Sequence, residues 1–460
     1  MTKVPLSTFG QAGKPARPLA TRRAVVASAA ALPAIVASGC GAFGGHAAPA
    51  KTLTPQMIKV WVPFGDQQFN FEGSWADFLA KHPGWTREIA YDVSNVKFIT
   101  SVTAGDSPDV FMQPSMFLLD AAAKGMIRPL DEYIARDKVD WKQYYSAGKI
   151  GALYRQKHYG LPHHVDVYSI YGNEKVLREA AFDTKKKPAS WDELLSTNAR
   201  LTRQGPEGQP TRMGFIPFYG VSPFVLYYFP ANGAPLMSAG GTKVGFDNAA
   251  GLETLEWMSN AIKTLGGWDR IQSYRSQFAN GENGVGWALG RDAIGFGYVG
   301  CWNLGFRVFK ENPNAEIAQW HLPGGPSAKG KEFGQYIAMH TVIPTESKKP
   351  DAGWEFVMHD TSPVGQKHIQ WNFGSFDISS IPSVANNPES LKLQPWRKRM
   401  HELMADAKEP SFFPHPGSGD IGAAITAAIQ PFLRGEEGPK ATMDVLKRDT
   451  ERLMAQFRVS

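Results

Sequence analysis

Hydrophobic positions along this 460-residue chain alternate between short strand-like runs and longer helical patterns. Residues 57–64 ("MIKVWVPF") and 107–115 ("SPDVFMQPS") have the apolar composition of strands. Each run precedes a helical stretch, at 74–83 and at 117–125. Strands that alternate with helices predict an α/β fold with a mostly parallel sheet.

Helix boundaries are marked further along the chain. In "DTKKKPASWDELL", Ser190 is a good N-cap and Glu193 completes a capping box. Gly266 ends a later helix, and Pro363 occupies the first position of another, "SPVGQKHIQW". The helix before Gly266 is predicted from four apolar residues on one face: Leu252, Leu255, Ile262 and Leu265. The run "DAIGFGYVG" is predicted to be a buried strand that leads into a glycine-bearing turn.

The amino terminus has the pattern of an export signal. Arg22 and Arg23 precede an uncharged run, 24–38, that is too short to span a bilayer comfortably. The run ends in "VASGC", which resembles a bacterial lipobox in which Cys40 is lipidated. We therefore expect a signal peptide over 1–39 and a flexible tether over 40–53. The paired arginines leave the export route open between the general and the twin-arginine pathways.

Charge and cysteine content narrow the classes of function. The net charge is +6, and five of those charges lie before Cys40, so the rest of the chain is nearly neutral and gives no evidence for a nucleic-acid partner. Only two cysteines are present, and lipidation of Cys40 would leave Cys301 without a disulfide partner. With 43% hydrophobic and 20% charged residues, the chain is expected to fold around a large core.

Several motifs, taken in order, resemble those of extracellular solute-binding proteins of ABC importers, in the sugar-binding branch that includes maltose-binding protein. The similar stretches are "SPDVFMQPSMFLLDAAAKGMIRPLDEYI", "GLPHHVDVYSIYGNEKVLREAAFD", "AIGFGYVGCWNLG", "LPGGP" and "PTESKKPDAGWEFVMH". Two features depart from the family's pattern. Gly172 interrupts the usual "YN", and His163 and His164 are not typical of the family.

The resemblance implies two α/β lobes joined by a hinge of crossing segments, with the ligand in the cleft between them. We expect one lobe from 54–161 and 322–378 and the other from 162–321 and 379–460. Crossings are expected near 160–163, 321–325 and 376–382. Domain interfaces and the carboxyl ends of strands are where α/β proteins bind small ligands.

A sugar has apolar C–H faces and a belt of hydroxyls, so its site requires aromatic rings together with polar acceptors and donors. Residues of these types follow the predicted strands and crossings. The candidate ligand-binding residues are Phe64, Asp66, Gln67, Gln113, Ser115, His163, His164, Asp166, Tyr219, Tyr227, Trp302, Asn303, Phe373 and His415.

Most candidates also have a purely structural interpretation. Trp302 is either a ring under the ligand or a core residue, and Asp166 is either a ligand acceptor or a structural acid. For Tyr219, Tyr227 and Phe373, packing in the core is favoured over contact with a ligand. One of the two histidines is expected to be a structural hydrogen-bonding group. Because the chain contains no "HExxH" and no cysteine pair, no metal site is expected from these histidines and Asp166.

The segment "GPSAKGKE" resembles a phosphate-binding P-loop, but Glu332 stands where Ser or Thr would reach Mg²⁺. A strand-like run, "FGQYIAMH", follows it in place of a helix, so we reject this interpretation.

The sequence therefore predicts a non-enzymatic lipoprotein that binds a sugar or related polyol and delivers it to ABC permease subunits. It is expected to be a monomer at the cell surface or in the periplasm, anchored to the bilayer through Cys40, with no cofactor and no nucleic acid. The alternative is a secreted carbohydrate-active enzyme, which would need two carboxylates about 5–10 Å apart. The identity of the solute stays open, from monosaccharide to oligosaccharide.

Overall fold

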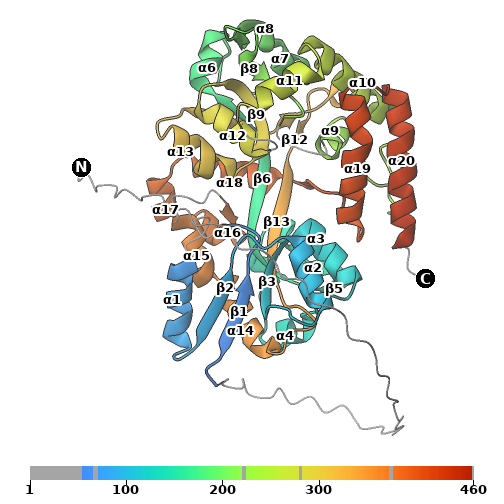
Figure 1. Cartoon of the computed structure of the whole chain (residues 1–460). Coiled ribbons are helices and arrows are strands. Elements are labelled where there is room, and N and C mark those ends of the chain that lie inside the picture. The colour runs from blue at the N-terminus through green and yellow to red at the C-terminus, as the bar shows by residue number, and fades with distance from the viewer. Residues whose placement is uncertain (1–53, 66–70, 220–223, 279–281, 372–376, 458–460) are drawn as a thin grey trace, which may run out of the picture. The chain divides into compact units, whose positions relative to one another are not determined.

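The computed structural model describes residues 54–65, 71–219, 224–278, 282–371 and 377–457. Its first three strands are parallel, and each is followed by a helix (Figure 1); the sequence predicted the first and the third of these strand–helix pairs. The strands are β1 (Met57–Trp61), β2 (Thr86–Ala90) and β3 (Val110–Pro114). The helices that follow them are α1 (Phe71–Lys81), α2 (Asn95–Thr103) and α3 (Ser115–Ala123).

The central strand is β6 (Leu161–Asn173), and all thirteen of its residues are buried. It pairs with β13 (Gln335–Val342) on one side and with β9 (Ile294–Gly300) on the other, both antiparallel. The main sheet runs in the order β2-β1-β3-β13-β6-β9-β8-β7. The sheet is therefore mixed. The expectation of a mostly parallel sheet was wrong at its centre, because β13 is antiparallel to both β3 and β6.

Two groups of elements lie at opposite ends of β6 and β13, which run side by side between them (Figure 1). The first, called here the amino-terminal group, has separate apolar cores, among them one that contains Phe78 and Trp354 and one that contains Phe98. Besides β1–β3 and α1–α3 it contains α4 (Asp131–Arg136), α5 (Ser146–Ile150), β4 (Leu153–Tyr154), β5 (Lys157–His158), α14 (Pro350–Asp360), α15 (Pro363–Trp371) and α16 (Pro382–Ala385).

The second, called here the large group, shares one extensive apolar core that includes Trp191, Phe215 and Met258. Its strands besides β9 include β7 (Arg203–Gln204), β8 (Pro210–Phe215), β10 (Ile317–Trp320), β11 (Leu322–Pro323) and β12 (Glu332–Phe333). Its helices are α6 (Glu174–Glu179), α7 (Trp191–Ser196), α8 (Asn198–Leu201), α9 (Val225–Ala231), α10 (Ala249–Thr264), α11 (Trp268–Arg275), α12 (Glu282–Gly290), α13 (Phe309–Glu311), α18 (Arg397–Asp406), α19 (Ser418–Leu433) and α20 (Pro439–Gln456).

The chain returns from the large group later than expected. The backbone N–H of Gly325 donates to the carbonyl of Ala231, 2.9 Å away, so the expected crossing at 321–325 lies within the large group. The return occurs along β13. A short strand, β14 (Ile378–Ser379), then pairs with β6 beside His164 and Val165, in the region where a third crossing was expected.

Two sequence features have clear local causes. The Ser190 hydroxyl accepts a hydrogen bond from the Glu193 N–H, which confirms the predicted cap of α7. At Gly172, a Cβ atom would lie 2.8 Å from both Leu177 and Trp320. The unusual glycine of the "YGN" motif is therefore required by close packing across β6.

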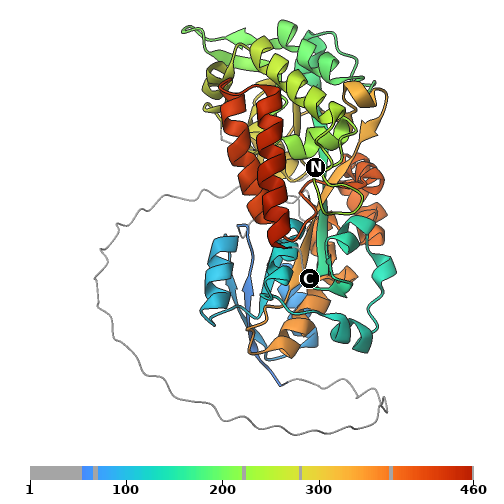
Figure 2. The same cartoon turned by 90° about the vertical axis from the view of Figure 1, so that its right-hand side faces the viewer.

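Helices α19 and α20 pack side by side, and α19 also contacts α3 of the amino-terminal group (Figure 2). Lys124, just after α3, lies 3.9 Å from the carboxylate of Asp420 on α19. This surface pair links the two groups away from the central strands. None of the helices in the described ranges is both long and apolar enough to cross a membrane.

Candidate ligand-binding site

A pocket of about 560 Å³ lies between the amino-terminal group and the large group, where β6 and β13 pass from one to the other. Such a volume is typical of a site for a small organic molecule. It is lined by Pro63, Phe64, Gly65, Pro114, His164, Asp166, Tyr168, Trp287, Trp302, Phe306, Arg307, Lys310, Ile337, Met339 and Asp377.

Four aromatic residues that line the pocket, Tyr168, Trp287, Trp302 and Phe306, are called here the aromatic wall. The Tyr168 and Trp302 rings meet edge to face, with centroids 5.5 Å apart and planes at 89°. A Cβ atom at Gly300 would lie 2.1 Å from the Trp302 ring. The glycine therefore lets the indole fold back over the end of β9, and this contact fixes where the ring stands.

The bottom of the pocket carries His164, Asp166 and Asp377, called here the polar floor. His164 Nε2 lies 3.6 Å from Asp166 Oδ2 and 3.8 Å from Asp377 Oδ1. All three residues are at most 3% exposed. Asp166 also accepts a hydrogen bond from the Cys301 thiol, with Sγ 3.3 Å from Oδ1.

A bulge in the pairing of β6 with β13 explains how two consecutive histidines come together. Met339 pairs with His164 and His340 pairs with Pro162, so His163 is the extra residue. Consecutive side chains of a regular strand point to opposite faces, and a bulge changes that direction. Here the two rings meet, with His163 Nδ1 2.7 Å from His164 Nδ1.

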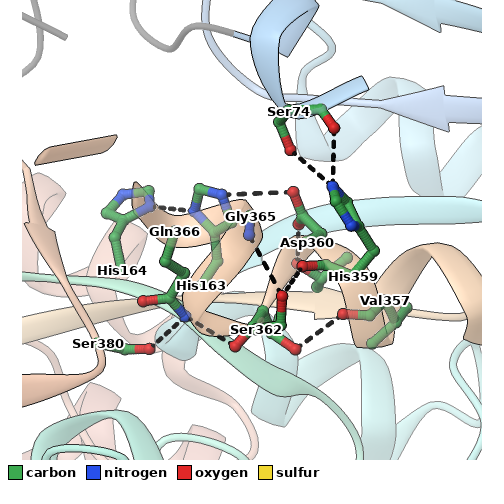
Figure 3. A network of polar contacts seen from close by, with 12 residues as sticks. Ser74, His163, His164, Val357, His359, Asp360, Ser362, Gly365, Gln366 and Ser380 are labelled. Atoms are coloured by element: carbon green, nitrogen blue, oxygen red, sulfur yellow. Dashed lines mark hydrogen bonds and ion pairs between the residues drawn. The ribbon is translucent and has the colours of Figure 1, made fainter. Parts of the chain in front are cut away.

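The histidine pair continues into a buried network behind the pocket (Figure 3). His163 Nε2 lies 3.6 Å from Asp360 Oδ1, and the Thr341 hydroxyl donates to the other oxygen of Asp360 at 2.8 Å. Next to Asp360, His359 lies 2.7 Å from the Ser74 carbonyl. The network therefore joins β6 and β13 to α14 and α1.

Burial controls the ionisation of these groups. It lowers the pKa of His163 and, with further repulsion from His163 and His340, holds the pKa of His164 well below 6.5. Both rings are therefore neutral near pH 7. Burial and the carboxylates of Asp166 and Asp377 hold the pKa of the Cys301 thiol well above its usual value, so the thiol stays protonated.

Cations lie near the pocket on two sides. Arg397 behind the floor is fully buried, and burial lowers its pKa to about 10 although Asp377 acts in the opposite direction. Arg307 is half-buried and Lys310 is exposed at the opening. The pocket therefore has an acidic floor, and Arg307 and Lys310 form what is called here its basic rim. The sequence did not suggest this separation of charge.

Four of the sequence candidates line this pocket: Phe64, His164, Asp166 and Trp302. His163 lies behind His164. Asp66, Gln67, Phe373 and the proposed lipidation site Cys40 are outside the described residues. The remaining candidates are buried away from the pocket lining: Gln113, Ser115, Tyr219, Tyr227, Asn303 and His415.

Those buried candidates have structural partners. The Ser115 hydroxyl donates to the Ala338 carbonyl at 3.0 Å, and the Asn303 amide donates to the Gly300 carbonyl at 3.3 Å. The Tyr219 ring lies under the Arg275 guanidinium, 5.5 Å away. Tyr227 packs behind Tyr168, with ring centroids 5.0 Å apart. The Gln113 amide donates to Asn95, and His415 accepts from the Gly417 N–H.

Sequence reasoning missed several lining residues. Tyr168 is two positions beyond Asp166 on β6, so period-two alternation places both on one strand face and was an available signal. Trp287 and Phe306 lie in helical segments of the large group. Asp377 reaches the floor only because β14 pairs with β6, and no local pattern reveals that pairing.

Comparison with known proteins agrees with this architecture. Residues 65–367 match the family model of the bacterial extracellular solute-binding proteins, and the chain belongs to this family. A putative binding protein of Brucella abortus (strain 2308) is 24% identical over 289 residues, and one of Brucella suis biovar 1 (strain 1330) shows the same identity. These matches cover 60% of this chain and 65% of each relative, so the chain spans slightly less than two thirds of their length.

Solved structures show the same fold. CpMnBP1 with mannotriose bound superposes with a TM-score of 0.72 at 21% identity, over 86% of this chain and 99% of that one. MalE3 of T. maritima with maltose bound gives a TM-score of 0.71 at 14% identity, over 86% and 100%. The fold is thus that of the two-lobe binding proteins, as the resemblance in the sequence implied.

Proposed function

We propose that this protein is the extracytoplasmic binding component of an ABC importer and that it takes up a sugar or related polyol in the pocket between the two groups. The observation that carries the proposal is the pairing of an aromatic wall with a polar floor in one pocket. Aromatic rings cover the C–H faces of a sugar, while carboxylates accept hydrogen bonds from its hydroxyls.

The relatives support this choice of solute. Similar folds have been solved with mannotriose, maltose and tagatose bound. A first test is calorimetric titration of the purified protein with these three sugars, with maltotriose and with a polyol such as sorbitol. Saturable binding of at least one is expected. Failure of every sugar and polyol to bind would remove the proposed solute class.

The alternative is hydrolysis of a carbohydrate, and one observation favours testing it. Asp166 and Asp377 approach each other within 4.8 Å at the polar floor, close to the ~5 Å separation of a retaining glycosidase pair. We expect binding without turnover. Incubation of the best-binding oligosaccharide with the protein, followed by chromatography of the products, distinguishes the two. Release of shorter sugars that is lost in Asp166→Asn would establish the enzyme.

We further propose that the two groups act as lobes that close over the solute about β6, β13 and β14. All three segments connect the groups through backbone pairing at the level of the pocket. Closure should reduce the radius of gyration measured by small-angle X-ray scattering when solute is added. An unchanged scattering profile at saturating solute would contradict this motion.

Membrane attachment through Cys40 and delivery to permease subunits complete the proposal. The lipobox pattern supports the anchor, and the family supports the partner. Cys40→Ala should move the protein from the membrane fraction to the soluble fraction and abolish labelling by a fatty-acid analogue. Cys301→Ala is the matched control, because the other cysteine is buried and should leave labelling intact. An unchanged membrane fraction in Cys40→Ala would exclude lipidation as the anchor.

A further inference from the structure

The polar floor has the arrangement of a metal-binding site. One ligand-type atom from each of His164, Asp166 and Asp377 lies within 4.8 Å of the other two, and all three residues are buried. Around a divalent ion with bonds of about 2.0–2.2 Å, neighbouring ligand atoms lie about 3.3–3.6 Å apart. The separations of 3.6 and 3.8 Å from His164 Nε2 lie at or just above that range, and the three ligand atoms, which are within 4.8 Å of one another, would move closer together around an ion.

The backbone presents these three side chains to one point. His164 and Asp166 are two positions apart on β6, so they share a strand face. Ile378 pairs with Val165 and Ser379 with His164, which carries the preceding Asp377 to the same face. The Asp166 oxygen Oδ1 accepts from Cys301, while Oδ2 faces His164. Three ligands are thus held by paired strands rather than by a loose loop.

The histidine pair supplies an orienting partner for the ligand nitrogen. The two Nδ1 atoms are 2.7 Å apart, a distance that fits one N–H···N hydrogen bond in which either ring can be the donor. When His164 is the donor, His163 has its own proton on Nε2, facing Asp360 at 3.6 Å. His164 Nε2 then presents a lone pair to the floor. Ligand histidines in metal sites commonly donate their other N–H in this way, and that hydrogen bond fixes the tautomer.

We propose that the polar floor binds a divalent transition-metal cation through His164 Nε2 and the carboxylates of Asp166 and Asp377, with the remaining coordination positions open to the pocket. One imidazole with two carboxylates suits Zn²⁺ or Mn²⁺, whereas Ca²⁺ takes six to eight oxygen ligands. The sequence analysis rejected a metal site at the histidines and Asp166 for lack of a ligand motif, and Asp377 was not among its candidates. The proposal goes beyond solute binding and does not require the solute to be a sugar.

Calorimetric titration of the full chain, purified in mild detergent and treated with a chelator that is then removed, tests this proposal. Saturable binding of one Zn²⁺ per chain is expected, with weaker binding of Ca²⁺. Asp377→Asn and His164→Gln should each weaken Zn²⁺ binding at least tenfold. Two variants are used because Asp377 also faces the buried Arg397, and a melting curve shows whether each variant is folded. Bound Co²⁺ should give a visible absorption band that both variants lose.

The matched control is the surface pair His158 and Asp131, whose side chains lie 2.8 Å apart. His158→Gln should leave Zn²⁺ affinity and the Co²⁺ band unchanged. Absence of saturable Zn²⁺ binding overturns the proposal, as does binding that is unaltered in both floor variants or lost in the control. Sugar binding measured in the presence of chelator reports on the proposed function separately, so that either result can fail without the other.

Discussion

The aromatic wall and the polar floor form neighbouring sides of one pocket, but they are assembled in different ways. Three residues of the wall, Trp287, Trp302 and Phe306, come from one stretch of the large group and are only partly buried, while the fourth, Tyr168, is a buried residue of β6. The floor joins β6 to Asp377, from a distant part of the chain, and is almost fully buried. Apolar side chains are stabilised by any close contact that removes them from water, whereas buried carboxylates require specific hydrogen-bonding or charged partners.

This difference makes the floor the more fragile side. Loss of a ring removes contact area from the ligand, but loss of a floor carboxylate also disturbs charges that support the fold. The expected effects therefore differ in kind as well as in size. Variants of the floor should change stability, and variants of the wall should change mainly affinity.

The largest effect is expected for Asp377→Ala. Arg397 is fully buried, and the charge of Asp377 opposes the lowering of its pKa. Removal of one member of a buried charge pair lowers the free energy of unfolding by about 3–5 kcal/mol, because the other charge then stays buried without a partner of opposite charge. Chemical denaturation should show this loss. Asp420→Ala, at an exposed acid, should change the free energy of unfolding by less than about 1 kcal/mol. A similar small change in Asp377→Ala would show that the floor is not coupled to the fold.

The second largest effect is expected from pH, to which the buried histidines around the polar floor should respond and the aromatic wall should not. Burial lowers the pKa of His340, a neighbour of His164, to about 4 from 6.5. Between pH 6.5 and 4 this histidine is protonated in the unfolded chain but not in the folded chain, so the free energy of unfolding falls as the pH falls. The stabilisation that the neutral ring contributes is fully present above pH 6.5. The expected loss from this group is about 3 kcal/mol.

Denaturation at several pH values measures that slope. His340→Gln should reduce that slope by the contribution of this one group, because other buried histidines such as His401 also have lowered pKa values, even if the stability of the variant at neutral pH is lower. Trp302→Ala, on the wall, carries no titratable change and should keep the slope of the unmodified protein. Equal slopes in all three proteins would mean that His340 is not the group that responds to acid.

The same contrast explains how much the sequence could predict. The helix cap at Ser190, the strands β1 and β3 and the helix begun by Pro363 depend on neighbouring residues, and the structure confirms them. Trp302 was identified as a candidate because it follows a predicted strand in "AIGFGYVGCWNLG", a stretch that resembles the family's pattern. Asp377 and the bulge at His163 depend on strand pairing between distant segments, and a single sequence contains no signal for that pairing.

The aromatic wall should show its role in affinity. Trp302 stands half-buried over Gly300 and against Tyr168, with one side to the pocket. Loss of ring contact with a sugar costs on the order of 1–3 kcal/mol, so Trp302→Ala should weaken binding roughly ten- to a hundredfold. Trp302→Phe, which keeps a ring, should retain most of the affinity.

Unfolding measured on the same variant tests the alternative of a core residue. Truncation of a fully buried tryptophan to alanine lowers the free energy of unfolding by about 3–5 kcal/mol, and truncation of a half-buried one lowers it by less. Trp302→Ala that melts much earlier yet binds the sugar with unchanged affinity would place the ring in the core rather than in the site.

The smallest effect is expected at the basic rim, and it sharpens the contrast with the acidic floor. Lys310 is exposed at the pocket opening, where water and salt screen its charge. A neutral sugar gains little from such a cation, because its hydroxyls carry no charge for the ammonium to attract. Lys310→Ala should therefore leave affinity within about twofold and independent of salt between about 50 and 500 mM. An acidic sugar or a sugar phosphate would behave differently, since the loss of one favourable charge would weaken binding at low salt and much less at high salt. Titrations of both proteins at the two salt concentrations thus decide whether the rim takes part in selecting the solute or whether selection is confined to the wall and the floor.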